Sequence, residues 1–573
     1  MRNRLSFVPF SCLMLFSLAG CTASTSAPVI SDDPFQKAEE NLTPLAGTCT
    51  FVVSSGLMTV TATGTETAII SRRAADSAIL QNGVSCDNLA TSSTLKKLVI
   101  NGTATGTTVI LDFTNGLFGV GTSSTTSTGI AVNLTTSGTL GIRGTAAADK
   151  IAYGATGVNL NNDAFKDITM TNVSTHVVYL GDGADTFTAA GGTDIGGVFT
   201  SPITVYGGAG ADVFNQGTVA TPGEIIHGGA DIDTVSYALR TAAMTVTVGA
   251  GANDGDGTAT ENDDINSDVE IVTGGTAADS MTAAPTVAVT FNGVLGDDTL
   301  IGDTGADVLN GDGGNDTLRG KAGADVLSGG DGNDTFDEEA ASNGGDIFNG
   351  GAGIDTLDYH LRPTGGVTVT MDGIAANDGA LVSGVSEGDN CKADVENILG
   401  SAFGDTITGN ALNNTITGGD GDDILNGGAG DDTFLTGTVN DGLDTISGGT
   451  GVDTIDYSAR LVGVTVTLNP ASPSGAPAIV ADPAATPPVV GVAAEADALA
   501  IDMENVVGTA QIDTITGNAA ANELVGGAGV DNLNGNEGDD VLDGGGQADV
   551  LDCGTGDGDI GFNTTGTRTA CEF

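Results

Sequence analysis

Residues 293–337 read GVLGDDTLI-GDTGADVLN-GDGGNDTLR-GKAGADVLS-GGDGNDTFD, and this stretch decides the fold. It is a run of nine-residue units in which the sixth residue is always Asp and the eighth is Leu or Phe. The Gly-rich first half is typical of a turn, because Gly tolerates positive φ, and the last three residues are typical of a short strand. A single unit buries almost no apolar surface. Stability must therefore come from stacking units into an inner ladder of eighth-position side chains.

The same unit recurs far beyond this stretch. Arrays run over residues 400–435 and 508–552, and separate copies occur at 180–188, 207–215, 228–236, 350–358 and 448–456. The pattern resembles the repeats-in-toxin (RTX, hemolysin-type) family of calcium-binding repeats, whose motif is G-G-x-G-x-D-x-U-x. This resemblance implies an all-β fold, a right-handed parallel β-roll or β-solenoid. Two units would form one coil, so that like positions recur every 18 residues.

The resemblance also implies a set of calcium ligands. Each Ca²⁺ would lie between stacked turns, bound by sixth-position carboxylates and by backbone carbonyls, and such hard oxygen donors suit Ca²⁺ better than Mg²⁺. Asp298, Asp316 and Asp334 would line one edge, and Asp307 and Asp325 the other. The predicted ligands are Asp212, Asp298, Asp307, Asp316, Asp325, Asp334, Asp355, Asp405, Asp423, Asp432, Asp453, Asp513, Asp531, Asp540 and Asp549. Asn414 and Asn522 replace Asp, so calcium sites there are expected to be weak or missing.

Composition fits a protein that needs cations. The 573 residues include 90 Gly and no Trp, and the formal net charge is -57. Such a charge excludes nucleic acid as a natural partner, since phosphate would be repelled. It also makes the compact chain repel itself unless cations are taken up. Because 39 % of the residues are hydrophobic, a disordered acidic chain is a poor match. A glycine-rich solenoid without metal is the alternative.

A longer repeat alternates with the arrays. It begins with DTVSYALR (233–240), DTLDYHLR (355–362) and DTIDYSAR (453–460), each followed by a segment of alternating apolar residues. Period-two alternation predicts a half-buried strand. We interpret the three blocks as longer coils with excursions at one edge of the roll. An ion pair between the recurrent Arg (Arg240, Arg362, Arg460) and Glu (Glu270, Glu396, Glu504) is expected to fix each excursion; ligand binding by these residues is the alternative.

The N-terminal residues predict a signal peptide and a site of lipid attachment. Arg2 and Arg4 precede an apolar stretch too short for a stable membrane span, and Leu18-Ala19-Gly20-Cys21 resembles the lipobox of bacterial lipoproteins. The resemblance implies a signal peptide over 1–20, lipidation of Cys21 and attachment to a membrane of the cell envelope. An outer-membrane lipoprotein facing the surface or the periplasm is expected. A plain signal peptide is the alternative.

The remaining chain is divided by composition. Residues 21–45 are interpreted as a tether, 46–180 as a degenerate solenoid with a cap, and 181–573 as the calcium-binding roll. In an oxidising compartment the local cysteine pairs are Cys49 with Cys86 and Cys553 with Cys571, which leaves Cys391 odd. Other pairings remain open.

Catalytic motifs are scarce. The three His residues are far apart and none lies in H-E-x-x-H, and GVSEG (384–388) lacks the strand-to-helix context of a nucleophile elbow. We therefore expect no enzyme. The favoured function is a lipid-anchored calcium-binding protein of the envelope whose folding depends on calcium. A calcium-scaffolded adhesin or structural protein with an unknown cell-surface partner is the rival, and a hydrolase that carries this roll is a third reading.

Overall fold

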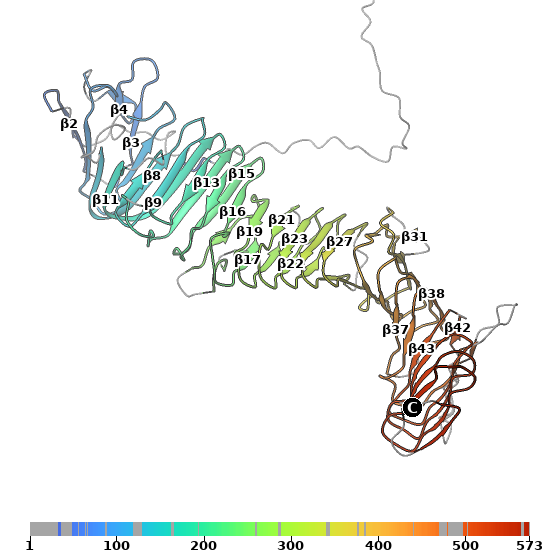
Figure 1. Cartoon of the computed structure of the whole chain (residues 1–573). Coiled ribbons are helices and arrows are strands. Elements are labelled where there is room, and N and C mark those ends of the chain that lie inside the picture. Colours follow the sequence, from blue (N-terminus) through green and yellow to red (C-terminus); the bar gives the residue numbers. More distant parts are fainter. Residues whose placement is uncertain are drawn as a thin grey trace, which may run out of the picture.

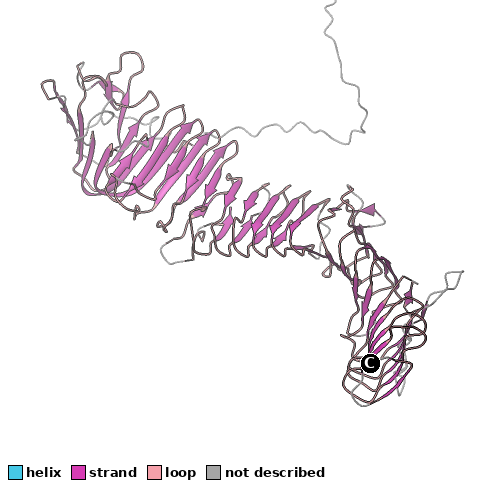
Figure 2. Ribbon diagram, viewed as in Figure 1, coloured by secondary structure: helices cyan, strands magenta, loops and turns pink. Residues whose placement is uncertain are grey.

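The computed structural model describes residues 33–35 and 48–571, apart from 56, 64, 66, 86, 88, 119–128, 162–164, 193, 252, 258–260, 285–287, 340–343, 375–377, 383–384, 439–440, 469–477, 480–496, 501 and 563–565. These residues form strands and turns without any helix (Figure 2). No membrane-spanning helix is therefore found among them. The strands stack into one elongated solenoid (Figure 1).

Each coil of the nonapeptide arrays is built from two nonapeptides, as the sequence predicts. Thr299 pairs with Thr317 in parallel register, and on the facing side Val308 pairs with Val326. The eighth-position side chains point inward and are fully buried, which gives a continuous apolar ladder. In the first array its members are Leu300, Leu309, Leu318, Leu327 and Phe336.

Within the described residues the strands belong to four sheets, the largest of which has 23 strands. Its N-terminal members are β1 (Thr48–Val52), β2 (Leu57–Ala62), β3 (Thr67–Arg72), β4 (Ile79–Gln81), β5 (Val84–Ser85), β6 (Lys97–Gly102), β7 (Thr108–Asp112), β8 (Ile130–Arg143), β9 (Lys150–Gly154), β10 (Gly157–Asn159), β11 (Ile168–Asp182) and β12 (Thr186–Thr188). The others are β13 (Ile203–Ala209), β14 (Val213–Asn215), β15 (Ile225–Ala230), β16 (Thr234–Ser236), β18 (Asp264–Ile265), β19 (Ile271–Thr273), β21 (Thr290–Asn292), β23 (Val308–Gly313), β25 (Val326–Asp331), β27 (Ile347–Ala352) and β32 (Asn390–Cys391).

The second sheet of the described chain has 14 strands and runs nearly to its end: β17 (Thr245–Val248), β20 (Ser280–Ala283), β22 (Thr299–Ile301), β24 (Thr317–Arg319), β26 (Thr335–Asp337), β28 (Thr356–Asp358), β33 (Asn397–Leu399), β35 (Thr415–Thr417), β37 (Thr433–Leu435), β39 (Thr454–Asp456), β43 (Asn505–Val507), β45 (Glu523–Val525), β47 (Val541–Asp543) and β49 (Ile560–Phe562). The third contains β29 (Val367–Thr370), β30 (Gly379–Val382), β31 (Val385–Ser386), β34 (Thr406–Thr408), β36 (Ile424–Ala429), β38 (Thr445–Thr450), β41 (Ala478–Ile479) and β42 (Ala498–Leu499). The fourth contains β40 (Thr465–Thr467), β44 (Thr514–Thr516), β46 (Asn532–Asn534), β48 (Val550–Asp552) and β50 (Thr567–Thr569).

The N-terminal region is part of the same stack. β2, β6, β8, β11 and β13 follow one another in parallel. Its coils are wider than those of the arrays, because β8 and β11 are 14 and 15 residues long (Figure 1). Asp33 and Phe35, from the predicted tether, are attached to its flank. Asp33 forms an ion pair with Arg143 at 2.7 Å, and Phe35 packs beside Ile69 and Ile110.

The three longer blocks form coils with three strands instead of two, which we call junction coils. In the second junction coil, the three strands are β27, β28 and β29. The next coil adds β32 on β27, β33 on β28 and β34 on β29. The column of β27 then ends at β32, whereas the columns of β28 and β29 continue as the two faces of the next array. The other junction coils, β15–β17 and β38–β40, replace a column in the same way. The excursions predicted from sequence are thus points where one face of the roll is exchanged.

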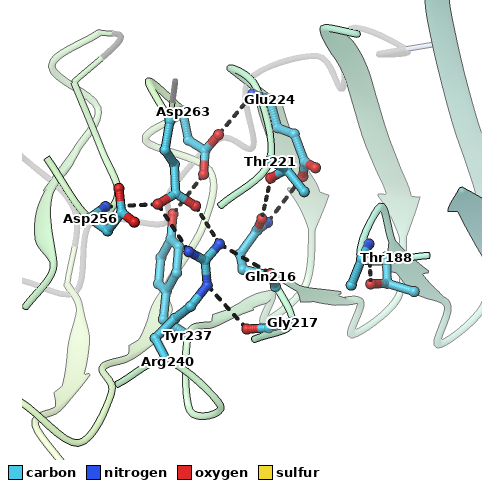
Figure 3. A network of polar contacts seen from close by, with 11 residues as sticks. Thr188, Gln216, Gly217, Thr221, Glu224, Tyr237, Arg240, Asp256 and Asp263 are labelled. Carbon is cyan, nitrogen blue, oxygen red and sulfur yellow. Dashed lines mark hydrogen bonds and ion pairs between the residues drawn. The ribbon is translucent and has the colours of Figure 1, made fainter. Parts of the chain in front are cut away.

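A buried polar network holds each junction coil. In the first, the Tyr237 hydroxyl donates to Asp263 at 3.1 Å, and Arg240 donates to both carboxylate oxygens of Glu261 and to the carbonyls of Gln216 and Gly217 (Figure 3). The Tyr hydroxyl and the carboxylate recur as Tyr359 with Asp389 at 3.0 Å and as Tyr457 with Asp497 at 3.2 Å.

The expected pairing of the recurrent Arg with the recurrent Glu is wrong. Arg362 binds Glu338 and Glu387, and Arg460 binds Asp441. Glu270, Glu396 and Glu504 instead accept the backbone N–H of Asp233, Asp355 and Asp453. Each Glu stands at the sixth position of a nonapeptide. It therefore takes the place of the sixth-position Asp in the column of carboxylates and is not directed toward the Arg.

The cysteines are placed as follows. Cys553 and Cys571 form a disulfide near the C-terminal end of the stack. Cys49 is disulfide-bonded, and its expected partner Cys86 lies outside the described residues, as does Cys21. Cys391 is a buried free thiol that occupies an inward position of β32.

Candidate metal centre

Sixth-position carboxylates form hydrogen-bonded columns along both edges of the roll. The backbone N–H of Asp298 donates to Oδ1 of Asp316 at 2.7 Å, and that of Asp316 donates to Oδ1 of Asp334 at 2.8 Å. On the other edge, Asp307 donates in the same way to Asp325 at 2.7 Å. The predicted division between the edges is therefore present. One oxygen of each carboxylate is used to hold the coil before it in register.

The second oxygen of most of these carboxylates has no such use. Oδ2 of Asp298, for example, is buried and accepts no hydrogen bond from the described residues. We call a turn with this property an open turn. The predicted ligands in open turns are Asp212, Asp298, Asp316, Asp325, Asp334, Asp355, Asp423, Asp432, Asp453, Asp531 and Asp540. A buried charged oxygen without a donor is costly, so each open turn favours a cation.

The glycine at the first position of the unit leaves room beside this oxygen. A Cβ added to Gly293 would lie 2.1 Å from Oδ2 of Asp298 and 2.7 Å from the carbonyl oxygen of Gly311 in the next coil. Gly311 has the same relation to Asp316 and Gly329, at 2.1 and 2.6 Å. A carboxylate oxygen and a carbonyl oxygen from successive coils therefore border one space. This donor set of hard oxygens fits Ca²⁺.

Burial makes these carboxylates hard to ionise without a cation. It raises the pKa of Asp298 and of Asp325 to about 7, and that of Asp316 to about 6. Neighbouring carboxylates of the same column raise the pKa further, whereas the N–H bond to Oδ1 lowers it. A bound divalent cation would stabilise the charged form and release protons.

Three predicted ligands differ from the rest. Oδ2 of Asp307, Asp405 and Asp513 accepts the backbone N–H of the second residue of its own unit, at 2.8, 2.7 and 2.7 Å. We call such a turn a closed turn. The turns of Asn414 and Asn522 are closed as well, because the side-chain oxygen accepts the N–H of Asn410 and of Asn518. Asp549, the last predicted ligand, accepts the N–H of Asp531 through Oδ1 at 3.0 Å.

Four sixth-position carboxylates with the open-turn geometry were missed by the choice of ligands: Asp185, Asp233, Asp346 and Asp559. Asp185 and Asp233 lie in copies visible in the sequence, so the nonapeptide pattern could have found them. The unit of Asp346 lacks Gly at its first two positions, and that of Asp559 contains one extra residue, since Asp540 and Asp559 are 19 residues apart. No cluster of three or more His, Cys, Asp or Glu side chains suited to a metal occurs among the described residues. The donors that border an open turn such as that of Asp298 are one carboxylate oxygen and a backbone carbonyl of the next coil.

Comparison with known families agrees with this geometry. A family model described as "RTX calcium-binding nonapeptide repeat (4 copies)" matches residues 177–195, 292–325, 311–337, 399–434, 438–459, 502–533 and 525–560. These segments are RTX calcium-binding repeats. They cover about a third of the chain and coincide with the stacked turns described above. None of the curated proteins matches the chain.

The RTX repeats explain why the site is distributed. Each open turn provides one free carboxylate oxygen, and the next coil provides the carbonyl that faces it. The protein is a calcium-binding β-roll.

Proposed function

We propose that this protein is a lipid-anchored, calcium-dependent solenoid of the cell envelope. In this proposal Ca²⁺ uptake converts a self-repelling acidic chain into an ordered roll, and no catalytic group is required. The observation that carries it is the row of buried carboxylate oxygens without a hydrogen bond, repeated through the open turns. The formal charge of -57 makes the compact chain repel itself, and cations bound at those oxygens would reduce this repulsion and so stabilise the folded state.

Coupling of calcium to folding has a direct test. Circular dichroism and thermal melting of the full chain should be recorded in EDTA and in calcium, together with a calorimetric titration. We expect loss of β structure or a much lower Tm in EDTA, and half-saturation at about 10⁻⁴ to 10⁻³ M as in extracellular calcium modules. An unchanged spectrum and an unchanged Tm in EDTA would refute the proposal.

The membrane part of the proposal rests on Cys21 and the residues before it. Metabolic labelling with a radioactive fatty acid and fractionation of cells should be compared for the parent and Cys21→Ser. We expect the parent to be labelled and to fractionate with membranes, and the variant to lose both properties. Label retained on Cys21→Ser would exclude this cysteine as the anchor. Protease shaving of intact cells would then distinguish the outer surface from the periplasmic side.

A further inference from the structure

The backbone at the second position of the unit differs between open and closed turns. In open turns this residue has positive φ: 114° for Gly208, 116° for Gly330 and 106° for Gly419. Val294 and Lys321 adopt the same region, at 83° and 69°, and their turns are open too. The second residue of each closed turn described above lies outside this region. The N–H of the second residue reaches Oδ2 only in the closed geometry.

Closed turns are held by a second hydrogen bond. Oγ of Ser401 accepts the N–H of Phe403 at 3.2 Å, and Oγ1 of Thr509 accepts that of Gln511 at 2.9 Å. Equivalent bonds from the fourth residue to the second are made to Thr145, Asp303, Asn410 and Asn518. A Ser, Thr, Asp or Asn at the second position can thus hold the closed turn by accepting a local backbone donor. Asp312 and Asn536 at the same position have positive φ instead, and their turns are open. Gly275, which has no such acceptor, also forms a closed turn: its N–H donates to Oδ2 of Asp279, and its φ lies outside the positive region.

We infer that the backbone conformation of the second residue of each unit decides whether its turn takes calcium. In a closed turn, Oδ2 is satisfied by an N–H whose positive end occupies the place where a cation would approach. In an open turn, the same oxygen has a free lone pair beside the carbonyl of the next coil. The inference rests on the proposed calcium binding and deepens it. It assigns Asp423 and Asp531 as calcium ligands and removes Asp307, Asp405 and Asp513 from that set.

The chain itself supports this assignment. Asn stands at positions 414 and 522, and both of these turns are closed. In these two turns the amide oxygen accepts the N–H of the second residue, and the amide nitrogen donates to the carbonyl of Glu396 or Glu504, so a closed turn forms without a carboxylate charge. By contrast, the sixth residue is Asp in every open turn named above. The carboxylate charge is thus kept where Oδ2 is free.

Matched Asp→Asn variants test the inference, because Asn removes the carboxylate charge with little change of shape and keeps one oxygen acceptor, as the closed turns of Asn414 and Asn522 already do. Asp405 (closed) and Asp423 (open) are neighbours in one column, linked by a 2.8 Å bond. Asp513 (closed) and Asp531 (open) form the same pair in the next array, also at 2.8 Å. Calcium bound per chain should be measured by equilibrium dialysis at about 1 mM free calcium, near the expected affinity.

We expect Asp405→Asn and Asp513→Asn to bind as much calcium as the parent, and Asp423→Asn and Asp531→Asn to bind less. Equal losses in both members of a pair would overturn the inference while leaving calcium binding by the roll intact. No loss in Asp423→Asn and Asp531→Asn would also overturn it, since the open-turn carboxylate would then be no ligand. If the parent bound no calcium, the proposed function itself would fail. Two arrays are used so that a folding defect in one pair does not decide the result.

Discussion

The two oxygens of a sixth-position Asp have separate tasks. Oδ1 of Asp316 holds the coil before it through the N–H of Asp298, whereas Oδ2 is buried and receives no hydrogen bond from the part of the chain that the structure describes. The nonapeptide letters predicted which residues line the edges, because the Gly-rich turn and the Asp recur in fixed register. They did not predict that Oδ1 and Oδ2 have different partners. The partner of Oδ2 depends on whether the N–H of the second residue of the unit points toward it.

The pH dependence of stability should differ between the metal-free and the calcium-loaded protein. The folded pKa of Asp298 and Asp325 is raised to about 7, above the value of about 3.9 in an unfolded chain. Without metal, the resulting stabilisation is fully present below about pH 4 and is lost as the pH rises through 7. The Tm in EDTA should therefore be higher at pH 5 than at pH 8. With saturating calcium the order should reverse, because protons compete with the cation. A Tm in EDTA that rises from pH 5 to pH 8 would contradict this.

The inner ladder should carry much of the stability of the loaded protein. Phe336 is fully buried and its ring centroid lies 5.6 Å from that of Phe348. Phe336→Ala should lower the free energy of unfolding in calcium by about 3–5 kcal/mol, through lost burial and a cavity. Urea unfolding in calcium measures this. Phe562 is 54 % exposed, so Phe562→Ala is the control and should change stability by no more than about 0.5 kcal/mol.

At the scale of elements, the arrays were easier to predict than the junction coils. Alternating apolar residues from Val367 correctly indicated a strand, now β29. The exchange of one column for another could not be read from these letters, since it depends on which earlier strand each new one stacks upon. The acid partners of the recurrent Arg also escaped prediction. Glu261, Glu387 and Asp441 lie in segments whose sequence differs from block to block.

The buried Arg of a junction coil should matter far more than an Arg on the surface of the roll. Arg362 is 3 % exposed and ion-paired with Glu338 and Glu387. Arg362→Met would leave two buried carboxylates without that cation and should cost about 3–5 kcal/mol in the free energy of unfolding. Arg319 pairs with Asp337 and Glu339 at a more exposed site, so Arg319→Met should cost less than about 1 kcal/mol. Similar losses in the two variants would argue against a structural role for the network.

At the scale of the whole molecule, the second and third junction coils begin equivalent units. Asp355, Tyr359 and Arg362 correspond to Asp453, Tyr457 and Arg460, and the closed turn of Asp405 corresponds to that of Asp513. In both units the first column ends, the middle column continues and a new one begins. The coil that stacks on the turn of Asp334 could therefore be formed by the unit that begins at Asp355 or by the unit that begins at Asp453.

Deleting residues 355–452 should give a shorter folded protein. Ile354 would be joined to Asp453, which takes the place of Asp355 and can accept the N–H of Asp334. We expect a Tm in calcium close to that of the parent and fewer bound calcium ions. Deleting residues 359–452 is the matched control: it joins unlike positions of the unit, breaks the register and should lower the Tm strongly. Equal Tm values for the two deletions would show that the register at this point is unimportant.

Column exchange gives the molecule a way to change its reach. Because each junction coil hands the stack to a new face and closes its own polar contacts, tandem duplication of one junction with its array would lengthen the rod without disturbing the coils on either side. The distance between the N-terminal end and the disulfide near the C-terminal end can then grow or shrink in whole steps during evolution. The length of such a protein would change in steps of one unit of about one hundred residues, roughly the size of an ordinary domain.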